Sequence, residues 1–318
     1  MKEYQLWKRR SNMSPIKSKI ESTFKSKDTE EFLDRLFYRP VGYGMAVVSK
    51  SIGLTPNIVT FISIFFGMLG GHLLFYRNVT INLTGALFLI IAESLDSADG
   101  QLARMTNIHS RYGKILDGVA GNLMFVSIYV HMCARFIVEG GSPFIFLIAG
   151  VAGFSHSLQS AMSDYYRNFY LFFVYGEGKS IIDELKDLKE KNKALSWSKN
   201  TGKKFLMSLY VDYTRKQEFL SKAIRTLYKE VYDKYQGKVP DWLKTEYRKL
   251  NKPLIKYGNI LTTNTRMIFL FFMVFYANVL YYFLFEIIVL NLLLVYFIFK
   301  HEDAGKKLLQ MVKSHTEN

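Results

Sequence analysis

The pattern of apolar and polar positions divides the chain into membrane-spanning and polar parts. Long apolar runs lie between residues 56 and 170 and again between 267 and 299, and most charged residues lie outside them. Runs of this length with few charges are typical of helices that cross a bilayer. Their limits predict spans at about 56–76, 80–103, 111–138, 143–170, 267–280 and 281–299. The sequence therefore predicts an all-α integral membrane protein built as a six-transmembrane-helix bundle.

The polar segments divide the chain into five parts. Residues 1–54 are basic and end in an amphipathic helix over 31–54, which we expect at the membrane interface. Residues 55–175 hold the first four spans and 263–300 the last two. Residues 176–262 form a cytoplasmic helical insert, and 301–318 form a cytoplasmic tail. The insert has an apolar stripe at helical spacing but no run able to cross a bilayer, so it could pack on the bundle, lie on lipid headgroups or mediate self-association.

The net charge of +15 comes mainly from the N-terminal segment, the insert and the tail. Lys and Arg are enriched in the cytoplasmic parts of membrane proteins, where a basic surface is also attracted to anionic lipid. Six spans then place both termini, and the connection between the second and third spans, in the cytoplasm. The basic residues are dispersed and no recognition motif is present, which argues against nucleic-acid binding. The single Cys133 excludes an intrachain disulfide.

Reactive side chains are concentrated in one stretch at the membrane edge, which reads DSADGQLARMTNIHSRYGKILDGVAG from Asp96 to Gly121. Asp96 and Asp99 are one turn apart on a single helix face, and Asp117 begins the next span. Charged side chains in spans are costly, and three neighbouring carboxylates repel one another unless a cation lies among them. We therefore predict a site for a hard divalent cation, Mg²⁺ or Mn²⁺, at Asp96, Asp99 and Asp117.

The spacing D-x2-D-G-x2-A-R-x8-G-x3-D is met in full by this stretch, through Asp96, Asp99, Gly100, Ala103, Arg104, Gly113 and Asp117. It resembles the signature of the CDP-alcohol phosphatidyltransferases, and the resemblance covers about residues 40–170 and 263–300. It implies a metal-dependent enzyme of phospholipid biosynthesis, which displaces CMP from a CDP-linked alcohol by the hydroxyl of a second alcohol. Family members are commonly shorter, so the insert stays unexplained. Homodimers are common among them, which makes a homodimer a candidate assembly.

The resemblance also implies which residues contact the CDP-linked substrate. Gly100, Ala103 and Arg104 would contact the cytidine nucleotide, and Ser110 aligns with a hydroxyl that does so in some members. Gly100, Ala103 and Gly113 lack bulk, which by itself would let a flat ligand come close. The start of the first span is similar to the family as well, and there the matching positions that contact the CDP group are Asn57, Ile58, Val59 and Thr60.

One position departs from the family pattern, in which a fourth Asp follows the third by four residues and is assigned as the base that deprotonates the acceptor. This chain has Gly121. A one-residue shift would bring the amide oxygen of Asn122 near the metals, although an amide has no basicity to take a proton. His109 and Glu93 are candidate substitutes for the base, beside Asp117 in the catalytic set. If none of these residues is the base, the metal-bound acceptor could be acidic enough to lose its proton without one. Alternatively, the chain could be a pseudoenzyme that binds CDP-lipid, or a transporter.

Two substrate arrangements fit the resemblance. CDP-diacylglycerol could give its phosphatidyl group to a polar acceptor such as inositol phosphate, glycerol phosphate or serine; alternatively, a lipid alcohol could accept a headgroup from CDP-choline or CDP-ethanolamine. Cationic residues near the site suit an anionic acceptor and favour the first arrangement; they are Arg111, Lys114, Arg167 and Arg266. In family branches with phosphorylated acceptors, basic residues in such places bind the acceptor phosphate.

Overall fold

The computed structural model describes residues 20, 23, 26, 28–108, 111–176, 182–276 and 278–315, without the side chains of Arg111, Tyr112, Lys114 and Tyr276. These residues form helices joined by turns, with no β-strand among them. Six helical segments of the described chain are long and apolar enough to cross a membrane, at 56–73, 79–106, 115–138, 145–175, 241–275 and 279–314. The predicted all-α membrane bundle is confirmed.

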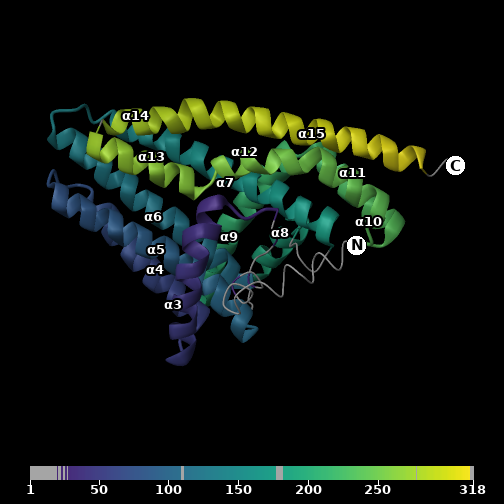
Figure 1. The fold of residues 1–318 in the computed structure, drawn as a ribbon, viewed down its shortest axis with the longest axis horizontal. Helices are drawn as coiled ribbons and strands as arrows, with labels where there is room; N and C mark the ends of the chain where they lie inside the picture. Colours follow the sequence, from purple (N-terminus) through teal and green to yellow (C-terminus); the bar gives the residue numbers. More distant parts are fainter. Residues whose placement is uncertain are drawn as a thin grey trace.

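The first half of the bundle is a tight group of three helices, α4 (Pro56–Leu73), α5 (Val79–Thr106) and α6 (Arg111–Val138), which lie side by side in Figure 1. Glycines allow this close approach. A Cβ on Gly71 of α4 would lie 2.8 Å from the backbone nitrogen of Ile128 on α6. One on Gly70 would lie 2.9 Å from the carbonyl oxygen of Gly85 on α5. Because Cβ atoms do not tolerate such distances, the glycines set the spacing of the three helices.

The segment before the bundle is also helical. A π-helical turn, η1 (Asp34–Tyr38), leads into α3 (Arg39–Ser51), which is steeply inclined to α4, α5 and α6 in Figure 1. Exposed apolar side chains occur along residues 32–52, which is the pattern expected of a segment that lies on a bilayer surface; they include Phe32, Leu36, Val48 and Ile52. The interfacial position itself stays a prediction.

The second half of the bundle consists of α7 (Ile145–Tyr175), α13 (Thr263–Tyr276) and a last long segment, Val279–Ser314. The last segment joins α14 (Val279–Leu284), the π-helical turn η4 (Phe285–Val289) and α15 (Leu290–Ser314). Its start differs from the predicted 281, because Asn278 caps α14 by accepting a hydrogen bond from the Leu280 backbone nitrogen at 2.9 Å. The predicted tail is helical, since α15 continues from the membrane span to Ser314.

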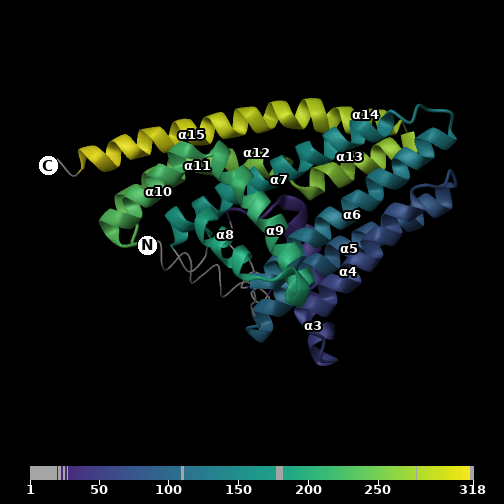
Figure 2. The ribbon, with the colours of Figure 1, turned by 180° about the vertical axis from the view of Figure 1, so that it is seen from behind.

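The insert is helical and packs on the bundle, which is one of the three arrangements that the sequence left open. It contains α8 (Leu185–Ala194), α9 (Trp197–Leu220), α10 (Lys222–Tyr235), α11 (Asp241–Asn251), the 3-10 turn η3 (Lys252–Leu254) and α12 (Ile255–Ile260). The apolar faces of α10 and α11 share a core with α7 and with the end of α15, in which Leu308 and Val312 are fully buried. Figures 1 and 2 show these helices and the C-terminus at one end of the molecule, opposite the turn from α4 to α5.

Candidate metal centre and nucleotide site

Three carboxylates converge where α5 and α6 pass each other. Asp96 and Asp99 come from α5 and Asp117 from α6, and each offers an oxygen so that all three oxygens lie within 4.8 Å of one another. Asp99 is buried, Asp96 half-buried and Asp117 exposed. The structure thus brings together the three residues that the sequence analysis assigned to one metal site.

The donor set fits a hard divalent cation. Carboxylate oxygens are preferred ligands of Mg²⁺, which holds them at about 2.1 Å, so that two ligands on opposite sides are about 4.2 Å apart. Sites with two metal ions place them about 3.5–4 Å apart. The three oxygens, within 4.8 Å of one another, are spread about as far apart as ligands of one ion. The half-open arrangement, with Asp117 exposed, also leaves coordination positions for a substrate.

Thr60 on α4 positions one of the three carboxylates. Its hydroxyl donates a hydrogen bond to Asp99 Oδ2 and also lies 3.1 Å from the Pro56 carbonyl oxygen. Thr60 is only 3% exposed, so its hydroxyl serves Asp99 and is not free for the CDP contact that the resemblance implies. Asn57, one turn earlier, is exposed at the start of the same helix. Such a hydrogen bond to a metal-ligating carboxylate fixes its orientation.

Arg104 carries unused hydrogen-bond donors near the cluster. Its guanidinium lies over Gly100, since a Cβ there would be 3.6 Å from Nη2. Arg104 Nε and Nη2 are buried, and neither has a hydrogen-bond partner among the described residues. Buried donors are nearly always satisfied, and a planar guanidinium suits phosphate oxygens. Gly100 and Ala103, both half-buried, therefore lie next to a group prepared for an anion.

Several predicted site residues lie wholly or partly outside the described part of the chain. His109 and Ser110 lie outside the described residues, and so do the side chains of Arg111 and Lys114. Gly113 belongs to the first turn of α6. The structure does not show the predicted shift of the Asn122 amide toward the metal site. Its side chain is exposed, and its amide nitrogen donates to the Gly118 carbonyl oxygen at 2.8 Å, on the surface of its own helix.

Arg266 is a second correction, because it is not available to an acceptor. It is fully buried and pairs with Glu286, with Nε 3.1 Å from Oε1. It also donates to the carbonyl oxygen of Leu261 at 2.6 Å and to Gln159. Each of the three guanidinium nitrogens donates a hydrogen bond within the bundle, so Arg266 holds α13 to its neighbours.

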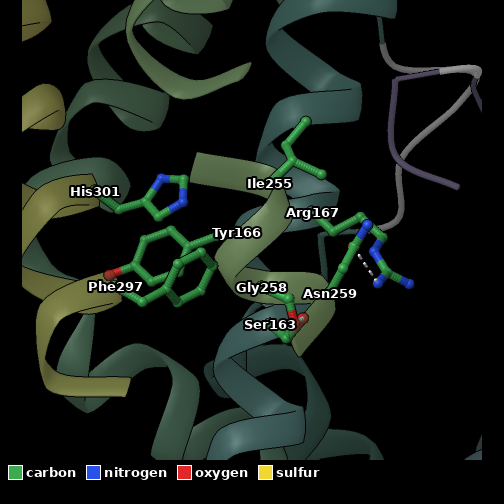
Figure 3. Close-up of a pocket in the computed structure, with 8 residues that line it drawn as sticks. All are labelled: Ser163, Tyr166, Arg167, Ile255, Gly258, Asn259, Phe297 and His301. Carbon is green, nitrogen blue, oxygen red and sulfur yellow. Dashed lines mark hydrogen bonds between the residues drawn. The ribbon is translucent and has the colours of Figure 1, made fainter. Parts of the chain in front are cut away.

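Arg167 on α7 is half-buried and lines a small cavity between α7, α12 and α15 (Figure 3). Its Nη2 lies 3.4 Å from Asn259 Oδ1, shown by the dashed line, and 3.9 Å from a carboxylate oxygen of Glu31. The cavity has a free volume of about 10 Å³, hardly enough for one water molecule. Arg167 thus remains a candidate for an anionic acceptor only at its exposed side.

The sequence analysis missed the acidic residues of the N-terminal segment. Asp28 accepts hydrogen bonds from Tyr170 and Tyr175, each at 2.9 Å, and pairs with Arg248 at 2.8 Å. Glu30 forms a two-point contact with Arg39, at 3.0 and 3.1 Å. These bonds tie the segment to α7, α11 and α3. The acidic run in an otherwise basic N-terminus was the available signal.

Two further carboxylates of this segment are buried together. Asn264 on α13 donates to Glu31 Oε2 and to Asp34 Oδ1, each at 2.8 Å, and Thr262 donates to Glu31. Burial, and next the charge of Asp34, raise the pKa of Glu31, and the hydrogen bond from Thr262 offsets this only in part. Burial likewise raises the pKa of Asp34. By contrast, hydrogen bonds from Lys252, Tyr175 and Tyr170 overcome the effect of burial on Asp28 and hold its pKa below the usual value.

A membrane-spanning helical bundle that gathers three carboxylates beside a buried guanidinium has a donor set that could hold a divalent cation and a phosphate group. The sequence profile of the CDP-alcohol phosphatidyltransferase family matches residues 53–164, and this range contains every residue of the carboxylate motif. Residues 53–164 therefore match a CDP-alcohol phosphatidyltransferase domain, and the resemblance read from the motif is confirmed for this part of the chain.

Two curated relatives match parts of the chain. An archaetidylinositol phosphate synthase of Pyrococcus horikoshii is 30% identical over 98 residues, which is 31% of this chain and 50% of the relative. An uncharacterised protein of Aquifex aeolicus is 30% identical over 82 residues, 24% of this chain and 40% of that protein. The chain thus spans half or less of the length of these relatives.

Proposed function

We propose that this protein is a membrane enzyme of phospholipid synthesis. It would transfer a phosphatidyl group from CDP-diacylglycerol, or a related CDP-linked lipid, to the hydroxyl of a polar acceptor, with release of CMP. The observation that carries the proposal is the cluster of Asp96, Asp99 and Asp117, whose oxygens lie within 4.8 Å of one another inside the segment that matches the family.

In this proposal Asp96, Asp99 and Asp117 hold Mg²⁺ or Mn²⁺. When bound, such an ion neutralises charge on the phosphate oxygens of the donor and orients them. Thr60 keeps the Asp99 carboxylate in its ligating orientation. The free donors of Arg104 bind a phosphate oxygen of the nucleotide.

The remaining nucleotide contacts come from residues with little side-chain bulk or with exposed polar groups. Gly100, Ala103 and Gly113 leave room for the cytidine, and Asn57 is exposed at the start of α4 for the CDP group. The match to the family supports each of these roles.

For the acceptor, we propose a phosphorylated polar alcohol such as inositol phosphate. The relative from Pyrococcus horikoshii, whose name gives an inositol phosphate lipid as its product, supports this choice. Arg111, Lys114 and the exposed side of Arg167 would attract the acceptor phosphate. The assay compares labelled CDP-diacylglycerol with labelled CDP-ethanolamine, each with its own class of acceptor. Release of CMP only from CDP-ethanolamine would favour the headgroup-transfer alternative and reject our choice.

We further propose that the site and both chain termini face the cytoplasm. The excess of Lys and Arg at the end of the molecule that holds the insert supports this orientation. Labelling of single cysteines introduced at exposed positions of α8 and of the turn between α4 and α5, with an impermeant reagent on intact cells, tests it. Crosslinking in the membrane would test the candidate homodimer in the same preparation.

A catalytically impaired pseudoenzyme that binds CDP-lipid is the second candidate, and Gly121 is the observation that favours it. Gly121→Asp and Asn122→Asp, made separately, distinguish the two candidates. If either substitution raises turnover by orders of magnitude, the present sequence is disabled. If the unmodified protein releases CMP at a rate typical of enzymes, the pseudoenzyme is rejected and the acceptor proton must pass to another group.

A further inference from the structure

Gly121 leaves open space beside the carboxylate cluster. It follows Asp117 by one turn on α6 and therefore lies on the same face of that helix. A Cβ built on Gly121 would meet no atom within 4 Å. The space next to the three carboxylates is thus not filled from α6, and a side chain from another helix can reach into it.

Contacts among α4, α5 and α6 define which part of α5 lies level with this space. The Ser63 hydroxyl on α4 donates to the Ala92 carbonyl oxygen on α5 at 2.9 Å. One turn further along α4, a Cβ on Gly67 would lie 3.0 Å from Met124 on α6. The helices α4 and α6 run in the same direction. One turn before the contact between Gly67 and Met124 on each helix, Ser63 of α4 is therefore level with Gly121 of α6. Gly121 therefore lies at the height of Ala92 and of the residue that follows it.

The residue that follows is Glu93. Its carboxyl group interacts most strongly with the charges of Asp34 and Glu31 of the N-terminal segment, and it also interacts with the charge of Asp117. Asp96, one turn along the same face of α5, interacts with Glu93 as well. Within the described residues, no ion pair joins Glu93 to a Lys or Arg. Glu93 is therefore an acid without a cationic partner among the described residues, and it is close enough to Asp96 and Asp117 to interact with both.

We propose that Glu93 is the catalytic base of this site and that α5 supplies the carboxylate that α6 lacks at position 121. This proposal rests on the proposed function. In the step that Glu93 serves, the acceptor oxygen attacks the phosphorus that carries the lipid alcohol, and a new oxygen–phosphorus bond forms. The bond from that phosphorus to the bridging oxygen breaks, and its electron pair leaves on CMP. The acceptor proton passes to the Glu93 carboxylate and from there to water.

Other groups near the site are less suited to this role. Asn122 cannot take a proton and hydrogen-bonds to its own helix. Asp96, Asp99 and Asp117 are the proposed ligands of the metal, and a ligand with its charge engaged is a poor base. His109 lies outside the described residues. Glu93 lies at the height of Gly121 and is not one of the proposed metal ligands.

The test uses the full-length protein in lipid nanodiscs, with CMP release from CDP-diacylglycerol as the first readout. General base catalysis contributes about 10²–10⁴-fold, so Glu93→Gln is expected to lower kcat by at least about 100-fold with little change in the acceptor KM. Adding Gly121→Asp to Glu93→Gln returns a carboxylate to the open space and is expected to recover at least tenfold. Gly118→Asp in the same background is the matched control. Its Cβ also meets no atom within 4 Å, but it points about 100° away from Asp117 around α6, so no recovery is expected.

A second readout distinguishes a base from a ligand. Mn²⁺ binding, followed by paramagnetic resonance, and thermal stabilisation by CDP-diacylglycerol are both expected to be unchanged in Glu93→Gln. A tenfold loss of Mn²⁺ affinity would overturn the proposal, because Glu93 would then be a metal ligand. Turnover equal to that of the unmodified protein would overturn it too, and would leave the proposed function intact. Absence of CMP release by the unmodified protein with every CDP-linked donor would instead overturn the proposed function.

Discussion

The buried pair of Arg266 and Glu286 allows a quantitative test of how the bundle is held together. Both side chains are 0% exposed, and Tyr129 and Tyr282 also donate hydrogen bonds to the Glu286 carboxylate. Replacing Arg266 by Met leaves a buried charge without its partner, which costs about 3–5 kcal/mol. At about 1.4 kcal/mol for each factor of ten, the folding equilibrium shifts by about 10²–10⁴. Glu286→Gln strands the opposite charge and is expected to have a cost in the same range.

The double variant Arg266→Met/Glu286→Gln is expected to be more stable than either single variant, because it leaves no net buried charge. Coupling energies of contacting pairs reach about 0.5–3 kcal/mol. Unfolding of the purified protein by SDS in mixed micelles, followed by circular dichroism, measures all three variants. If the two single costs simply add in the double variant, the pairing argument is wrong. If Arg266→Met raises the acceptor KM and leaves stability unchanged, Arg266 binds the acceptor after all.

Three further predictions concern packing, metal binding and pH. Gly71→Ala is expected to destabilise the protein by about 1–3 kcal/mol, because the added Cβ would lie 2.8 Å from a backbone nitrogen of α6. Gly121→Ala places its Cβ in open space and is expected to stabilise the protein by up to about 1 kcal/mol. Thermal unfolding measures both variants. Asp99→Asn is expected to weaken Mn²⁺ binding at least tenfold in resonance titrations with unchanged helicity, and undiminished affinity would reject the metal site. Because the pKa of Glu31 is raised in the folded protein, the free energy by which Glu31 stabilises the docking of residues 28–38 is fully present at low pH. This free energy is lost as the pH rises through the raised pKa. Hydrogen exchange of this segment, corrected for the intrinsic rate, should therefore be faster at pH 8 than at pH 5, and Glu31→Gln should reduce the difference and leave the part that comes from Asp34.

The membrane spans could be predicted because their signal is local. An apolar run of about twenty residues marks a helix of membrane length whatever surrounds it. The continuation of α15 to Ser314 has no such signal. Its apolar residues Leu308 and Val312 alternate with polar ones, and only the presence of α10 and α11 makes that stripe a packing surface. The partner lies about eighty residues earlier in the chain, so the sequence of the tail alone indicates a polar segment.

The same distinction explains the outcome at the candidate site. Asp96 and Asp99 were related by helical periodicity and Asp117 by motif spacing, and the structure brings all three together. Arg266 was assigned to the acceptor because nothing next to it in the sequence distinguishes a paired arginine from a free one. Its partner, Glu286, is on the neighbouring helix and is aligned through a π-helical turn that no local pattern announces.

The length of the last helical segment has a mechanical consequence. Its 36 residues at about 1.5 Å each extend about 54 Å, whereas the hydrocarbon core of a bilayer is about 30 Å thick. One rigid rod therefore passes through the lipid and projects roughly 20 Å beyond it. Since α10 and α11 are fastened to the projecting end, a change in the tilt of the rod within a thinner or thicker membrane would be transmitted as a displacement of the insert. Bilayer thickness would in this way act on the positions of α10 and α11, which pack against the end of the rod.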